Sequence, residues 1–241
     1  MIRAVTPLLP LLLGIVLLVV GVTVLRSFGP RFRVGRLLST TPHVSIADAG
    51  ALAAGPARYV GVRGRVDADD EFEDDAHRPL VFRRVRLERH DGRRWVTFED
   101  HRQAVDFELH EGLDAIGIDG GALDAGLVVV GRESVGTAAD VADQLPEGIP
   151  PATAIRMRVE QVSSVEHAIA LGVPRFDPEG RPRLEAGLGR PLVLTTLEVP
   201  DAIRVLAEGR TRRPLAAAIC LAAGLVLVTI GLIWGALEAL A

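Results

Sequence analysis

Leu80-Val81-Phe82-Arg83-Arg84-Val85-Arg86-Leu87, followed after a short gap by Arg94-Trp95-Val96-Thr97-Phe98, is the stretch that indicates a β-rich domain. Both runs are rich in branched and aromatic residues and partly alternate in polarity, as strands do. Asp91-Gly92 lies between them and is a common hairpin turn sequence. The two runs therefore predict a pair of adjacent antiparallel strands.

The same kind of pattern continues on both sides of this hairpin. Ser45 and Asp48 before an Ala-rich stretch predict a short capped helix, roughly 46–54. Gly131 to Gly136 is interpreted as a turn. The domain is expected to be mainly β (α+β), an antiparallel sheet or sandwich. Further strands are expected at 59–66, 104–109, 115–118, 127–130, 154–159, 167–171 and 191–196, a short helix at 201–208, and core positions at Phe82, Trp95 and Phe107.

Both ends of the chain are apolar. Pro7 to Leu25 contains 19 residues without a charge and Leu215 to Leu237 contains 23, against about 20 needed to cross a bilayer. A cleavable signal peptide is the alternative for the first segment, but no Ala-x-Ala site follows Leu25. A buried core helix is the alternative for the second. The sequence predicts a membrane protein with two transmembrane helices flanking a soluble domain: an anchor with a basic linker at 1–36, the domain at 37–209 and a second anchor at 210–241.

Charge divides the chain in a similar way. Segment 37–209 carries 19 arginines against 30 carboxylates, a net charge of −11, and the chain contains no Lys. This acidity argues against nucleic acid as a partner. Seven arginines next to the apolar segments are expected to contact lipid headgroups, and they favour a two-pass protein of the cell membrane with a cytoplasmic domain. They are Arg26, Arg31, Arg33, Arg36, Arg210, Arg212 and Arg213.

The acidic run from Asp67 to Asp75 is the first candidate for a binding site. Clustered carboxylates suit a hard cation such as Ca²⁺ or a basic partner. The sixth position of the run is Phe72 rather than Gly, which does not fit an EF-hand loop. A solvated loop is the favoured interpretation. The candidate ligands for a cation are Asp67, Asp69, Asp70, Glu73 and Asp74.

Other chemistry is sparse in the sequence. Four histidines lie in the strand-rich half without the close helical spacing of a zinc hydrolase. The one cysteine, Cys220, lies in the second apolar segment, and neither a phosphate loop nor a dinucleotide glycine pattern occurs. No catalytic or cofactor-binding residue is therefore assigned, and no cofactor is expected. The histidines are His77, His90, His101 and His110.

A series of short motifs runs through the domain: Gly64-Arg65-Val66, Pro79 to Glu88, Trp95, Val105 to Leu109, Glu111-Gly112, Val159-Glu160-Gln161 and His167 to Gly172. They resemble those of the GIDE family, the membrane-side domain of mulan-type ubiquitin ligases, with Pro79-Leu80 where the family has Pro-Cys. The resemblance implies a module that binds or regulates a protein partner at a membrane. The family's ligase activity belongs to a RING domain with eight Cys and His ligands. None is found up to Ala241, so ubiquitin transfer is not expected.

Three functions from different classes remain open on the sequence. A non-enzymatic, membrane-tethered interaction or regulatory domain is favoured, with the lipid bilayer and a protein at its surface as partners, because a tether raises the effective concentration. A metal-dependent or hydrolytic membrane enzyme, using the His, Asp and Glu residues of the strand-rich half, is the alternative. A structural scaffold is the third, because Gly224 and Gly231 suggest a homo-oligomer formed through the second apolar segment.

Overall fold

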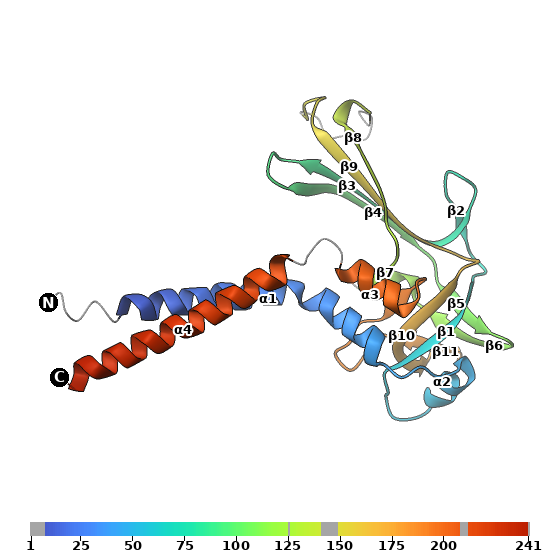
Figure 1. Cartoon of the computed structure of the whole chain (residues 1–241). Coiled ribbons are helices and arrows are strands. Elements are labelled where there is room, and N and C mark those ends of the chain that lie inside the picture. Colours follow the sequence, from blue (N-terminus) through green and yellow to red (C-terminus); the bar gives the residue numbers. More distant parts are fainter. Residues whose placement is uncertain (1–7, 125, 141–148, 208–211, 241) are drawn as a thin grey trace. The chain divides into compact units, whose positions relative to one another are not determined.

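The computed structural model describes residues 8–124, 126–140, 149–207 and 212–240 (Figure 1). They divide into two compact units, one made of the chain ends Met1–Arg33 and Leu206–Ala241, the other of Val34–Val205. The helices are α1 (Leu8–Thr40), α2 (Ile46–Leu52), α3 (Val199–Ala207), α4 (Arg212–Leu240) and the 3₁₀ helix η1 (Gly120–Ala122). The strands are β1 (Val60–Asp67), β2 (Phe72–Glu73), β3 (Pro79–His90), β4 (Trp95–Ala104), β5 (Phe107–Glu111), β6 (Asp114–Ile118), β7 (Leu127–Val128), β8 (Arg132–Thr137), β9 (Ala154–Ser163), β10 (His167–Phe176), β11 (Pro182–Glu185) and β12 (Val193–Thr195).

Five strands of the Val34–Val205 unit close into a barrel in the order β1, β5, β6, β11, β10 and back to β1. The β6–β11 pair is parallel, and the other four pairs are antiparallel. Along β1 the side chains alternate between the interior and the surface, from buried Val62 to exposed Asp67. This strand order is that of the OB-fold, a small Greek-key barrel. The fold hosts many unrelated functions and assigns none here.

Helix α2 packs against all five barrel strands. Its first turn is fixed by Ser45, whose hydroxyl accepts a hydrogen bond from the Asp48 amide at 3.1 Å, and by Glu111, whose carboxylate accepts one from the Ile46 amide at 2.9 Å. The capped helix predicted from Ser45 and Asp48 is thus confirmed. Ile46 and Ala49 enter the main hydrophobic cluster together with barrel residues such as Leu109.

A second sheet is built from two insertions into this barrel. One insertion, β2 to β4, connects β1 to β5, and the other contains β8 and β9 and connects β6 to β10. The strand register places Asp67, Phe107, Ile118 and His167 at the same end of the barrel, so both insertions leave from that end. They join through β3 and β9 into a sheet ordered β4, β3, β9, β8, with β2 beside the start of β3 (Figure 1).

The predicted antiparallel sheet or sandwich is therefore wrong as an architecture. A sandwich leaves its sheets open, whereas β1 meets β10 and closes the first sheet on itself. Parallel pairs also occur, between β6 and β11 and between β7 and β12. Of the expected core residues, Phe82 and Phe107 are buried. Trp95 is only half-buried, because its ring stacks on an arginine instead of entering the core.

The segment interpreted as a turn, Gly131 to Gly136, is also corrected, because it contributes most of strand β8. Its six residues pair with β9 in an unbroken antiparallel register, from Arg132 opposite Val159 to Thr137 opposite Ala154. The strand exists because of this non-local pairing, which the local sequence does not reveal.

The prediction of two transmembrane helices is wrong as well. In the described part of the chain, only α4 contains a segment long and apolar enough to cross a membrane, the 22 residues of Ala216–Leu237. The apolar part of α1, Leu9–Val24, is shorter. At about 1.5 Å per residue it falls short of the roughly 30 Å of hydrocarbon. The β-rich domain and one candidate span are what the structure supports.

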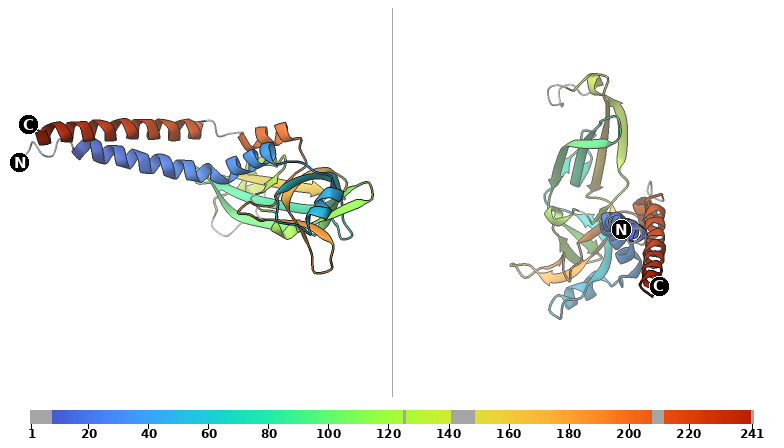
Figure 2. Two further views of the ribbon diagram at one scale, coloured as in Figure 1. Left: turned by 90° about the horizontal axis from the view of Figure 1, so that it is seen from below. Right: turned by 90° about the vertical axis from the view of Figure 1, so that its left-hand side faces the viewer.

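The apolar parts of α1 and α4 belong to the same unit and lie side by side (Figure 2). Glycines allow the close approach, since a Cβ on Gly14 would lie 2.8 Å from the Gly224 carbonyl oxygen. Gly231 faces Leu11 in the same way. The two glycines suggested for oligomerisation are therefore engaged within the chain. The outer surfaces of both helices expose large apolar side chains, among them Leu12, Val16, Val19, Leu225, Ile230 and Ile233.

Candidate functional site

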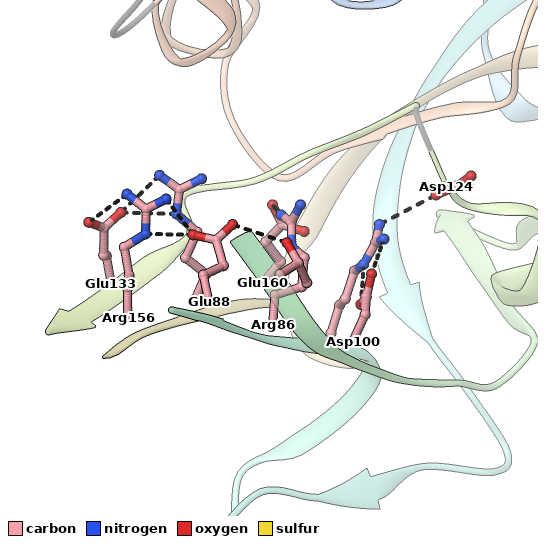
Figure 3. Close-up of polar contacts among 10 residues, drawn as sticks. Arg86, Glu88, Asp100, Asp124, Glu133, Arg156 and Glu160 are labelled. Atoms are coloured by element: carbon pink, nitrogen blue, oxygen red, sulfur yellow. Dashed lines mark hydrogen bonds and ion pairs between the residues drawn. The ribbon is translucent and has the colours of Figure 1, made fainter. Parts of the chain in front are cut away.

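One face of the second sheet carries a row of ion pairs across four strands (Figure 3). The row begins on β3, where alternation places Arg84, Arg86 and Glu88 on the same face. The register sets Glu160, Arg158 and Arg156 of β9 opposite these three. Neighbouring strands thus bring opposite charges together, a favourable cross-strand arrangement for most of these pairs.

The most buried pair joins Arg156 to Glu88. Their side chains are 14% and 10% exposed, and the Arg156 Nε donates to Glu88 Oε2 at 2.6 Å. The Arg156 guanidinium lies 4.5 Å from the centroid of the Trp95 ring, in a cation–π contact. On the β8 side, Glu133 accepts a hydrogen bond from the Arg158 Nε at 3.0 Å. These contacts hold β8, β9, β3 and β4 together.

The row continues toward the barrel. Arg86 donates to Glu160 at 2.5 Å, and Arg84 donates to Asp100 at 2.6 and 2.8 Å. The hydrogen bond from Arg84 lowers the pKa of Asp100 and, in return, raises the pKa of Arg84. Structural ion-pair networks shift pKa values in this way, and here each charged group of these pairs has its partner in the sheet.

Strand β8 forms one outer boundary of this sheet. All six of its residues are exposed, and nowhere in the described ranges does a strand pair with the edge of β8 that faces away from β9. We call this the β8 edge. The Ala138 amide donates to the Thr153 carbonyl at 2.8 Å, so alternate residues of β8 point their backbone groups toward β9. The backbone N–H and C=O groups of the other three residues, Glu133, Val135 and Thr137, therefore point outward, away from β9.

Thr137 supports this assignment. Its outward amide donates to Asp140 Oδ2 at 2.7 Å rather than to β9, and this bond lowers the pKa of Asp140. The β8 edge thus ends in a capped amide at Thr137, while Glu133 and Val135 present their N–H groups to solvent. Val135, 62% exposed, is an apolar residue on the charged face.

Strand β4 forms the opposite boundary of the sheet and is better protected than β8 against pairing with an added strand. A register shift at Leu87/Glu88 of β3 marks a β-bulge in its pairing with β4, and Glu99, Asp100, His101 and Arg102 follow one another along the strand. Bulges and charged side chains are the common means by which proteins block pairing at a sheet edge. The β8 edge has no bulge in its register with β9. It is the more accessible edge for an added strand.

A groove lies beside β8 on the face opposite the ion pairs. Its volume is about 390 Å³. Met157 and Val159 of β9 provide apolar surface, and Ser134 of β8 lies among the lining residues with Arg83 and Arg132. A strand paired with the β8 edge would alternate its side chains between this groove and the ion-pair face.

The acidic run is divided among three environments. Asp67, Asp69 and Asp70 line a cavity of about 320 Å³ that also contains Arg181 and Arg183. Glu73 contacts His77 Nδ1 at 2.7 Å. Asp74 is buried and accepts hydrogen bonds from the Arg78 side chain and from the amides of Ala76 and Arg78. The Arg78 contact lowers the pKa of Asp74 to about 2, so this carboxylate fixes a loop.

The remaining predicted residues lie elsewhere. Among the described residues, no three His, Cys, Asp or Glu side chains are grouped so that they could hold a metal ion. His110 lies 3.2 Å from Glu108, and His90 packs edge-on against Trp95. Of the arginines expected at the membrane, Arg31, Arg33 and Arg36 are exposed on α1. Arg210 and the side chains of Arg26, Arg212 and Arg213 lie outside the described residues.

Comparisons with known proteins give no information about this site, so its interpretation rests on its geometry. No family model, curated protein or solved structure matches this chain.

Proposed function

We propose that this protein is a membrane-tethered, non-enzymatic interaction domain that binds an extended protein segment at the β8 edge. The observation that carries the proposal is the regular, exposed β8 strand with outward N–H groups at Glu133 and Val135. An unprotected sheet edge is a template for strand addition, in which backbone hydrogen bonds supply affinity and alternate side-chain pockets supply specificity. The groove at Met157 and Val159 would supply one such pocket.

The membrane tether is part of the same proposal. Helix α4 has the length to span, and its outer surface exposes apolar side chains such as Leu225 and Ile233. Lipid would cover this surface. A domain held at the bilayer meets other proteins of that surface at a high effective concentration. The motif resemblance to the membrane-side domain of GIDE-type ligases supports a binding or regulatory role, and ubiquitin transfer is not proposed.

Basic residues favour a cytoplasmic position for the β-rich domain. Arg210, Arg212 and Arg213 precede the span of α4, whereas Glu238 follows it, and arginines near a span stay on the cytoplasmic side. We expect a cysteine in place of exposed Arg93, in a Cys220→Ser background, to resist an impermeant maleimide on intact cells and to react after the membrane is opened. Inside-out vesicles should label without lysis. Equal labelling of intact and opened cells would place the domain outside.

Strand addition is tested by removing one outward N–H group. A photo-crosslinking residue at Arg132 of the full chain should form protein adducts in native membranes. Val135→Pro should reduce these adducts at least tenfold, because proline lacks the N–H and is tolerated at sheet edges. Val135→Thr is the matched control, since threonine keeps both the N–H and the branched shape. Adducts that survive Val135→Pro would show that contact does not use the strand edge.

One observation favours a second function, a cation-dependent activity. Asp67, Asp69 and Asp70 of the acidic run do share a cavity, with Asp106, Glu108 and Asp177 nearby in its lining. Clustered carboxylates suit a hard cation, but Arg181 and Arg183 line the same cavity, and no three of the described carboxylates are grouped as metal ligands, so a cation would have to draw them together. Saturable Ca²⁺ binding to the full chain, lost when Asp67 and Asp69 are changed to Asn, would favour this alternative over the interaction domain.

A further inference from the structure

We propose that the segment bound at the β8 edge is the β8 strand of a second copy of this chain, in antiparallel pairing about a two-fold axis at Val135. The inference rests on the proposed function and names its partner. It joins the second sheets of two chains into one continuous sheet across the β8–β8 contact.

The backbone groups on the β8 edge suit this pairing. With Val135 opposite Val135 of the second copy, each Val135 amide donates to the other Val135 carbonyl. Each Glu133 amide donates to a Thr137 carbonyl across the axis. In a regular ladder the Thr137 amide would donate to the Glu133 carbonyl in return, but Asp140 already holds it at 2.7 Å, so each Glu133–Thr137 pair makes one bond instead of two. The pairing thus uses the N–H groups that the single chain leaves exposed.

The side chains of β8 are also self-complementary in this register. The strand contains one positive and one negative residue, Arg132 and Glu133. Arg132 faces Ala138 of the second copy, and Glu133 faces Thr137, so the charged residues of β8 itself do not stand opposite like charges. The Asp140 carboxylate bound to Thr137 is the one like charge near Glu133 in this register. On the other face Ser134 meets Gly136, a small pair beside the groove.

Val135 gives the pairing an apolar centre. In the single chain it is 62% exposed and lies opposite Arg156 of β9, among charged residues. In the pair, each Val135 covers the other. An apolar, β-branched cross-strand pair of this type is favourable in a sheet.

The membrane tether favours association of two copies of this chain, whereas their net charge opposes it. Copies anchored in one bilayer meet at raised effective concentration. The net charge of −11 over residues 37–209 opposes their approach. However, β8 itself is neutral, and charges more than about 8 Å away are screened at physiological salt.

Disulfide trapping of the full chain in native membranes tests the axis. In a Cys220→Ser background, Val135→Cys should form a symmetric disulfide dimer on mild oxidation, because the Cα atoms of such a pair lie about 5.5 Å apart, within the range a disulfide requires. Arg93→Cys, on the exposed β3–β4 turn, is the control and should give at most a tenth of that yield. A register test follows from Ser134 and Gly136, since chains carrying Ser134→Cys should crosslink to co-expressed chains carrying Gly136→Cys.

The outcomes separate the inference from the function on which it rests. A dimer yield at Val135 no higher than at Arg93 would overturn the second copy as partner. If the photo-crosslinker at Arg132 then gave adducts with another protein that Val135→Pro removes, the interaction function would stand alone. If neither experiment gave a product that depends on the β8 edge, both proposals would fail. A dimer at Val135 without the Ser134–Gly136 crosslink would overturn the stated register.

Discussion

Replacing Arg156 by Met is expected to lower the free energy of unfolding by about 3–5 kcal/mol, the usual loss when one partner of a buried ion pair is removed. Glu88, whose side chain is 10% exposed, would keep its charge without its guanidinium partner. The cation–π contact with Trp95 would be lost as well. Urea unfolding of the full chain in detergent micelles, followed by circular dichroism, measures the change.

Arg158 provides the matched control for this substitution. It lies on the same strand and face, but its side chain is 36% exposed and its partner Glu133 is 43% exposed. Arg158→Met should therefore cost less than about 1 kcal/mol. The double variant Arg156→Met, Glu88→Met should recover much of the stability, because an apolar pair leaves no charge buried. Equal losses for the two arginine variants would contradict the burial argument.

Replacing Phe82 by Ala should cost about 3–5 kcal/mol, as for other large-to-small changes of a buried aromatic residue. Phe82 is 1% exposed and belongs to the main hydrophobic cluster, although it lies on β3 of the second sheet. It therefore ties the inserted sheet to the barrel core. Phe176→Ala on β10, where the side chain is 49% exposed, is the control and should change stability by less than about 1 kcal/mol. Comparable losses in the same urea experiment would place Phe82 outside the core.

Elements that depend on local chemistry could be predicted from the sequence. The β3–β4 turn forms because Asp91 accepts hydrogen bonds from the amides of Arg93 and Arg94, at 2.9 and 2.8 Å. Gly92 supplies the positive φ of +88° that this turn requires. The Ser45 cap of α2 is equally local. Each of these signals lies within a few consecutive residues.

Features that depend on distant partners were missed. Arg132 to Thr137 has two small residues and little alternation, so only its register with β9 and the Glu133–Arg158 contact identify a strand. Trp95 was expected in the core, but its position is decided by Arg156, 61 residues later in the sequence. The acidic run from Asp67 to Asp75 suggests a single cation site, because its carboxylates are close together in the sequence. Asp74 turns to Arg78 while Asp69 faces the cavity.

The placement of both insertions at one end of the barrel has a consequence for the order of folding. The barrel closes only when β1 meets β10, with Val60 opposite Gly172, and the second sheet forms only when β3 meets β9. Val60 and Gly172 are 112 positions apart, and Leu80 of β3 and Ser163 of β9 are 83 apart, so the entropy of a long loop opposes both pairings. Neither insertion can complete its sheet alone. During synthesis, the edge of β1 that pairs with β10 and the edge of β3 that pairs with β9 would therefore stay exposed until β9 and β10 have been made. We expect folding to be slow and to begin at local hairpins such as β3–β4.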